Sequence, residues 1–417
     1  MCFKAAAWSR PKTWRVTRFC ARWCRRYQDC FVPMTSLNLS PQHRIFAAFA
    51  LHAFAMGNIF PRMPDIKSAM GVAEGILGLS LIGLPLGTLI TLTFAAPLLE
   101  RLGFRRSLLT MMPFVAILYA IAVHAMHPVL FFILLIPIGM LIGCIEIVIN
   151  VEADRVEKMI QRRIMNRAHA FWSFGFFGAG LFGAAMAQLG FSPQLHLALV
   201  IPLSLLGIAL FLGKYQPAPK RFEESTGDQP KFARPTAAIL VLVGVTVSAM
   251  LMEGAGIDWS AIYMRNIFAS GPFISGAAVA IGAFSQAITR FLVDDFIDRY
   301  SPSSVARLLL SGLAAGIVCV FFPINSFISL LGFALIGFGT SAIFPMALSA
   351  AAQRTDRPSV INVASLVQIA FTVFLVGPPL LGTVAEHWGI RWAFGVALPL
   401  VIFSFVTAPA LGFKSAR

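Results

Sequence analysis

Apolar stretches long enough to cross a lipid bilayer follow one another along almost the whole chain. A spanning helix needs roughly 20 mainly apolar residues, and short polar or Pro- and Gly-containing connections separate the stretches. Twelve spans are predicted, at about residues 44–61, 76–98, 107–126, 129–150, 169–190, 193–213, 236–257, 272–293, 304–323, 327–350, 360–384 and 391–412. Because 58% of the residues are hydrophobic and only 12% are charged, a soluble fold is excluded. The predicted fold class is an all-α polytopic membrane protein.

Lysine and arginine residues are concentrated in one of the two alternating sets of connections. The basic set contains Arg101, Arg105, Arg106, Arg155, Lys158, Arg162, Arg163, Arg167, Lys214, Lys220, Arg221, Lys231, Arg234, Arg299, Arg307, Arg354 and Arg357. The alternate set contains Arg62, Lys67, Arg265 and Arg391. By the positive-inside rule, the basic set and both termini are predicted to be cytoplasmic, in a multi-pass protein of the cell inner membrane. The net charge of +15 therefore indicates orientation, and no nucleic-acid partner is predicted.

Residues 1–43 form a basic, Trp-rich segment without the apolar core of a secretory signal. Two interpretations are open: a cytoplasmic arm that lies on anionic lipid, or sequence upstream of the true start at Met34. The second is favoured, because "MTSLNLSPQHR" makes an ordinary lead into the first span. Cys20, Cys24 and Cys30 have no nearby His and no paired C-x-x-C, so no zinc site is predicted.

A polar, Pro-containing linker at residues 214–235 divides the spans six and six. The halves are residues 44–213 and 236–412, and residues 413–417 are a short cytoplasmic tail. "GAGLFGAAMAQLG" in span five aligns with "GPPLLGTVAEHWG" in span eleven, with glycines at the first, sixth and last places. Such self-similarity predicts two six-helix pseudo-repeats with a central site near the midplane between them.

The connection after span two, "PLLERLGFRR", has a counterpart after span eight, "FLVDDFIDRYS". The first fits the pattern G-x-x-x-D-R-x-G-R-R, with Ala96, Glu100 and Phe104 in place of the first Gly, the Asp and the first closing Arg. Glycine permits a tight turn, and an acid at a helix end can pair with a neighbouring helix and hold the cytoplasmic side closed. The predicted gating residues are Glu100, Arg101, Arg105, Arg290 and Asp294, with Arg290 expected to pair with Asp294.

These features together resemble the major facilitator superfamily across residues 44–412. More narrowly, "GNIFPRMPDIKSAMG", "IEIVIN", "EGAGIDWSAIY" and "GFGTSAIFPMALS" are similar to the bacterial branch that includes the fucose permease. That permease has a Glu and, four residues later, an Asn on its fourth helix, so the resemblance implies that Glu146 and Asn150 handle sugar and protons. It also uses an acid on its first helix. Span one here offers His52 and Asn58 but no mid-span carboxylate, which argues against fucose itself.

Glu146 places a carboxylate inside a predicted span. An ionisable residue there costs about 2.5–3.5 kcal/mol on insertion scales, so it needs a partner, water or a function. One helical stripe contains Gly139, Gly143, Glu146 and Asn150. The glycines are expected either to allow close helix packing or to leave room for a ligand. Glu146 is predicted to couple protons from within a cavity, with a structural bond to a basic residue near Arg155 or Arg167 as the alternative.

Other polar residues within the spans are candidates for the cavity or the gates. The predicted cavity residues besides Glu146 are Asn58, Asn150, Trp172, Glu253, Gln286 and Gln368. For the two glutamines, an interhelical bond is an equal alternative. Arg62 after span one is expected to pair with Asp258 or Glu253 of span seven when the outer side is shut, because spans one and seven occupy equivalent places in the two halves.

The predicted function is secondary active transport by alternating access. A small hydrophilic solute, for which a sugar is one candidate, would enter with protons, because a carboxylate that alternates between buried and hydrated settings changes its proton affinity. The alternative is a proton-coupled exporter of drugs or metabolites; "GFFGAGLFGAA" in span five lacks the Gly-Pro signature of efflux members, which favours uptake. No enzyme, cofactor or metal site is predicted. The expected partners are the small-molecule substrate, protons and the bilayer, and the protein is expected to be a monomer.

Overall fold

The structure is a computed structural model, and it describes residues 37–95, 99, 102–219 and 234–412. Within these residues twelve helical segments are long and apolar enough to cross a membrane, and all regular secondary structure is helical. The predicted all-α fold with twelve spans is therefore confirmed. Most of the N-terminal segment, most of the linker and the C-terminal tail lie outside the described residues, and so do Glu100 and Arg101 of the predicted gate.

The first six spans make up the N-terminal half. In chain order they are α2 (Pro41–Gly57) with η1 (Phe60–Arg62) and α3 (Met63–Met70), α4 (Glu74–Leu81) with α5 (Gly83–Phe94), α7 (Phe104–Ala122), α8 (Pro128–Ile160), α9 (Met165–Gln188), and α10 (Pro193–Gly207) with η2 (Ile208–Leu212). The first span does not end at residue 61 as predicted, because Pro61 and Pro64 sit in the first turns of η1 and α3, where a proline is tolerated.

The last six spans make up the C-terminal half. They are α11 (Ala237–Phe268), α12 (Pro272–Arg299), α13 (Pro302–Phe321), α14 (Ser326–Thr340) with α15 (Ile343–Ala352), α16 (Ser359–Trp388), and α17 (Ile390–Gly395) with α18 (Leu398–Thr407) and η4 (Ala408–Gly412). The break between α14 and α15 leaves the Ser341 carbonyl oxygen free to accept a side-chain hydrogen bond, and Arg290 donates it.

Several helices continue beyond the apolar stretch that predicted them. The fourth span was expected to end at residue 150, but α8 continues to Ile160 and ends at Gln161, whose φ of 53° lies in the left-handed region. Charged residues one turn apart stabilise this extension: Arg155 bonds Glu152 at 3.4 Å and Lys158 bonds Asp154 at 3.1 Å. Hydropathy predicts the part of a helix that lipid covers, whereas this helix continues through a charged segment to the left-handed residue Gln161.

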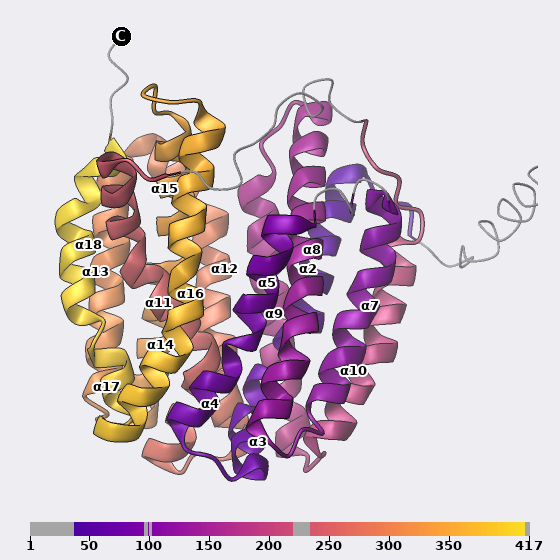
Figure 1. The fold of residues 1–417 in the computed structure, drawn as a ribbon, viewed down its shortest axis with the longest axis vertical. Helices are drawn as coiled ribbons and strands as arrows, with labels where there is room; N and C mark the ends of the chain where they lie inside the picture. Colours follow the sequence, from indigo (N-terminus) through magenta and orange to yellow (C-terminus); the bar gives the residue numbers. More distant parts are fainter. Residues whose placement is uncertain (1–36, 96–98, 100–101, 220–233, 413–417) are drawn as a thin grey trace, which may run out of the picture.

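The two halves lie side by side, and they separate towards one end of the bundle (Figure 1). That end carries α15 and the described ends of the linker, and it is called the linker face below. The opposite end, which carries α3, α4 and α17, is called the far face. Between the halves, α9 packs on α12 through small residues: a methyl group at Gly276 would lie 2.8 Å from the Cβ atom of Ala184. Small side chains allow the two backbones to approach closely at this contact.

The glycine stripe of α8 is a packing surface. A methyl group at Gly139 would overlap the Leu84 carbonyl oxygen of α5, and one at Gly143 would lie 3.0 Å from the Thr91 Cβ atom. Thr91 also donates a hydrogen bond of 2.9 Å to the Met140 carbonyl oxygen, which ties α5 to α8. Of the two expectations for these glycines, the structure supports close helix packing.

Replacing Gly139 by Ala is expected to lower the thermal stability of the detergent-purified protein by several degrees. Overpacking of this kind costs about 1–3 kcal/mol, because the added methyl group meets backbone that cannot rotate away. The matched control is Gly178→Ala in α9, where the nearest atom, in the Phe54 ring, is 3.9 Å from the added carbon. Equal melting temperatures for the two variants would contradict close packing of α5 on α8.

Candidate functional site

A cavity of about 1290 Å³ lies between the two halves. Its lining includes Met56, Phe60, Leu84, Glu146, Asn150, His169 and Trp172 from the N-terminal half and Glu253, Asp258, Arg290, Phe374 and Leu381 from the C-terminal half. The lining continues to Arg163, Asp298 and Gln353 at the linker-face ends of the helices, so the cavity opens towards that face. Of the seven predicted cavity and coupling residues, the structure places Glu146, Asn150, Trp172 and Glu253 in this lining.

Glu146 is the centre of a chain of polar contacts that crosses three helices. Its carboxylate lies 3.3 Å from His52 Nε2 of α2 and accepts a hydrogen bond of 3.1 Å from the Asn150 side-chain amide. The Asn150 Oδ1 atom in turn accepts a hydrogen bond of 3.1 Å from His169 Nε2 of α9. His52 is fully buried, whereas the Glu146 side chain is 29% exposed to the cavity. Among the described residues Glu146 thus contacts a histidine and an asparagine, and the alternative bond to an arginine near Arg155 or Arg167 does not form.

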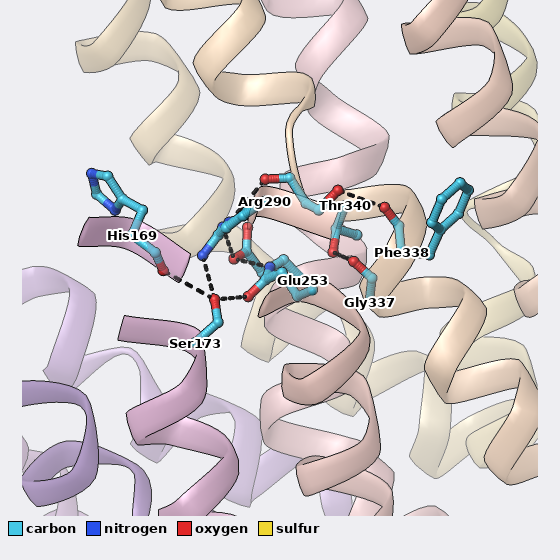
Figure 2. Close-up of polar contacts among 9 residues, drawn as sticks. His169, Ser173, Glu253, Arg290, Gly337, Phe338 and Thr340 are labelled. Carbon is cyan, nitrogen blue, oxygen red and sulfur yellow. Dashed lines mark hydrogen bonds and ion pairs between the residues drawn. The ribbon is translucent and has the colours of Figure 1, made fainter. Parts of the chain in front are cut away.

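A second polar cluster surrounds Arg290 and joins the halves at mid-depth (Figure 2). The guanidinium group donates to the Glu253 carboxylate of α11 at 3.2 Å, to the Ser173 hydroxyl of α9 at 2.8 Å and to the Ser341 carbonyl oxygen at 2.9 Å. The expected pairing of Arg290 with Asp294 is wrong for this state, because the guanidinium group bonds Glu253, Ser173 and Ser341 instead. Asp294 instead bonds Asn166 of α9, near the linker face.

Three predicted cavity residues are not among the residues that line the large cavity. Gln286 is buried between Glu253 and Ser173, with hydrogen bonds of 2.7 and 3.1 Å, so it forms an interhelical bond. Asn58 is fully buried, donates to the Phe54 carbonyl oxygen and accepts from His196 Nε2 at 2.9 Å. Gln368 is absent from the lining, in which α16 is represented on either side of it by Val367 and Phe371.

Ion pairs close the far face, but they are not the expected ones. The Asp65 carboxylate is shared by Arg62 Nε at 3.1 Å and by Arg265 Nη1 of α11 at 2.6 Å. Pairing of Arg62 with Asp258 or Glu253 is therefore wrong for this state, because helical continuation through η1 and α3 brings Asp65 within reach of both arginines. Asp258 lies deeper and lines the cavity.

Replacing Asp65 by Asn is expected to shift the protein about fivefold towards a state open at the far face. The bridge between Asp65 and Arg265 joins the two halves, and a partly exposed pair of this kind contributes about 1 kcal/mol. Spin labels at the exposed far-face positions Leu189 and Ile324 would report the distance between the halves.

The control for this shift is Asp154→Asn, which removes a carboxylate from a pair with Lys158 at the linker end of α8. It changes the same chemical group without touching the far-face bridge. An unchanged distance distribution in Asp65→Asn would contradict a closing role for the bridge.

On the linker face, the described part of the first loop motif forms its hydrogen bonds within the N-terminal half. Arg105 donates from Nε to the Tyr215 carbonyl oxygen at 2.9 Å and from Nη2 to the Gly213 carbonyl oxygen at 3.4 Å. This arginine ties the start of α7 to the end of the sixth span. A gating role for Arg105 stays a prediction for a state closed at this face.

The predicted site did not include four residues of these clusters: His52, His169, Ser173 and Asp65. His52 and His169 lie within predicted spans, and a titratable residue inside a span is itself a signal of function. Neither Ser173 nor Asp65 carried such a signal. Ser173 has a small hydroxyl group, which does not titrate, and Asp65 follows two prolines that were expected to end the span. Among the described residues no group of three metal-ligating side chains occurs.

The fold and the cavity define a multi-pass membrane protein of the carrier class, in which two six-helix halves enclose a central binding space. Residues 45–252 and 241–416 match the family model of the Major Facilitator Superfamily. The chain belongs to this superfamily and is a transporter, as its resemblance predicted; two of its relatives are named as transporters.

Among its relatives, an uncharacterised MFS-type transporter of Yersinia pestis is 27% identical over 386 residues, which cover 89% of this chain and 96% of the relative. Of solved structures, a mutant of the nucleoside transporter NupG aligns with a TM-score of 0.69 at 13% identity, over 89% of this chain and 99% of that one. A variant of the Escherichia coli fucose:proton symporter FucP aligns with a TM-score of 0.61 at 18% identity, over 90% and 99%. At these identities the solved structures show the shared fold.

Proposed function

We propose that the protein is a proton symporter that takes up a small hydrophilic solute across the cell inner membrane by alternating access. The observation that carries this proposal is the position of Glu146: a carboxylate in the cavity lining, in contact with His52 and Asn150. One fold neighbour is titled a fucose:proton symporter and another a nucleoside transporter, which supports a hydroxylated solute such as a sugar.

Glu146 is positioned to exchange a proton with whichever face the cavity meets. In this state the cavity opens to the linker face, which the positive-inside rule assigns to the cytoplasm. The Asn150 amide donates to the Glu146 carboxylate and His52 lies 3.3 Å from it, and a proton released from Glu146 in this state would leave towards the linker side. In the opposite state, water from the far face would reach Glu146 and a proton would bind before the solute is enclosed.

Three further groups are proposed to act beside Glu146. Asn150 and Trp172 line the same cavity and are placed to contact the solute, the amide by hydrogen bonding and the indole through its apolar face. The Asp65 bridge and the Arg290 cluster are proposed to stabilise the state closed at the far face.

Uptake by proteoliposomes tests the proposal. A panel of labelled monosaccharides, nucleosides and small amines is offered with and without an inward proton gradient. Accumulation above the outside concentration is expected only with the gradient, and a protonophore should abolish it. Accumulation that survives the protonophore would overturn proton symport, and expulsion of solute driven by an inward gradient would establish the exporter instead.

A further inference from the structure

Acidic residues outnumber basic residues in the cavity lining, which is the opposite of their ratio in the whole sequence. The whole sequence has 33 Lys and Arg residues against 18 Asp and Glu residues. The cavity lining, in contrast, has an excess of carboxylates: Glu146, Glu253, Asp258, Asp294 and Asp298 against Arg163 and Arg290. A cleft that is lined by one sign of charge and has low-dielectric walls concentrates ions of the opposite sign. The lining therefore favours cations, although the chain as a whole has a net positive charge.

The three carboxylates of the lining that lie away from the cavity mouth differ in their partners. Glu146 contacts His52 and Asn150, and Glu253 is paired with Arg290. Within the described part of the chain, the Asp258 carboxylate has neither an ion pair nor a hydrogen bond. A half-buried carboxylate without a partner loses part of its hydration, and a bound cation would offset this loss.

Asp258 also lies at the closed end of the cavity. On α11 it precedes Arg265, which takes part in the far-face bridge, by seven residues, a separation of about 10 Å along the helix. The lining contributed by the far-side parts of α2, η1 and α4 is apolar, with Met56, Phe60 and Leu81. A ligand that entered from the linker face would thus meet a single charge against an apolar wall.

We propose that the transported solute carries one positive charge, as a small hydroxylated amine does, and that Asp258 binds its ammonium group. The proposal rests on the proposed transport function and names the substrate class of the same cavity. Asp258 supplies the counter-ion, and Trp172, stacked on Phe176 at 5.3 Å between ring centroids, adds an aromatic face that attracts cations. Glu146 stays available for the proton.

The first test measures the electrostatic potential beside Asp258 and needs no knowledge of the solute. In a chain whose six cysteines are replaced by serine, Gly254→Cys places a thiol in the lining one turn before Asp258. Cationic and anionic methanethiosulfonate reagents then compete for it, with rates normalised to those with a free thiol. The cationic reagent is expected to react faster.

Asp258→Asn should lower this rate ratio about tenfold. A unit charge at about 6 Å changes the local concentration of each monovalent reagent roughly threefold, in opposite directions, even at the dielectric constant of water. Asp298→Asn, which removes a carboxylate at the cavity mouth, is the matched control and should change the ratio much less. A ratio that does not respond to Asp258→Asn overturns the proposal.

The second test compares matched solutes: glucosamine with glucose, and galactosamine with galactose. Wild-type proteoliposomes are expected to accumulate the amine in preference to the neutral sugar, and Asp258→Asn should reduce amine uptake at least about tenfold. Equal or better uptake of the neutral sugars would overturn the cation proposal while leaving proton symport intact. Amine uptake that ignores the proton gradient would instead overturn symport and leave the cation proposal standing. If none of the four solutes is accumulated, the ratio of the cationic to the anionic reagent rate from the first test decides the proposal alone.

Discussion

Replacing Glu146 by Gln is expected to abolish uphill accumulation of solute while solute exchange continues. The amide keeps the size and hydrogen-bonding capacity of the side chain, so the contact with Asn150 can persist and the cavity keeps its shape. An amide cannot bind and release a proton at physiological pH, so the solute gradient is no longer tied to the proton gradient. Reconstituted protein should therefore show counterflow of labelled solute at a rate near that of wild type and no accumulation above equilibrium.

Two variants make this experiment specific. Asp298→Asn removes a carboxylate at the mouth of the same cavity and should still accumulate solute. His52→Gln removes the group that lies 3.3 Å from the Glu146 carboxylate, and it should displace the pH dependence of uptake without abolishing coupling. Full proton-driven accumulation by Glu146→Gln would contradict the assignment of Glu146 as the coupling residue.

Truncation of Arg290 to Ala is expected to reduce transport about a hundredfold or more. Its guanidinium group holds Glu253, Ser173 and the Ser341 carbonyl oxygen together, and its loss leaves the Glu253 carboxylate without its cation. Breaking a largely buried ion pair by removing one partner typically costs about 3–5 kcal/mol. Because the cluster joins α9 of one half to α12 of the other, this loss should appear both in the melting temperature and in the uptake rate.

Conservative and double replacements separate charge from geometry at this position. Arg290→Lys keeps the charge but not the planar fork that reaches three partners, so it should retain partial activity. Adding Glu253→Gln to Arg290→Gln removes both charges and should recover much of the lost stability. Arg299→Ala, near the end of the same helix, is the matched control with expected wild-type behaviour. Wild-type transport by Arg290→Ala would contradict a central role for the cluster.

The spans and the Glu146–Asn150 pair could be predicted because both depend on spacing along one helix. Hydropathy over about 20 residues decides whether a segment crosses the bilayer, and a separation of four residues places two side chains on one helical face. The hydrogen bond between Asn150 and Glu146 follows from that separation alone. The division into two halves could also be predicted, because spans five and eleven share the same pattern of glycines.

Contacts between helices could not be read in this way. The approach of His52 to Glu146 depends on how α2 packs beside α8, and the sequences of these two helices do not predict that packing. The error over Arg62 has the same origin. The equivalent positions of spans one and seven suggested Asp258 or Glu253 as its partner, whereas the first span continues as a helix and places Asp65 beside Arg62. Asn58 was predicted to line the cavity because it is polar, but it is buried in a bond to His196. For Gln286 the sequence left a cavity role and an interhelical bond equally open, and only the packing shows that the bond forms.

The depth of the cavity has a consequence for the membrane voltage. Because water from the linker face can reach the level of Asp258, only the sealed layer between Asp258 and Arg265 separates the cavity from the far face. That layer is about 10 Å thick along α11, so most of the potential difference falls across it, at roughly 2.3 kcal/mol per elementary charge for each 100 mV. When the halves reorient, the sealed layer shifts to the other side of the cavity, so any charge in the cavity crosses most of the potential difference. Under the proposed symport of solute and proton, the step that reopens the far face is expected to move charge, and the steady transport current should then depend on the holding potential.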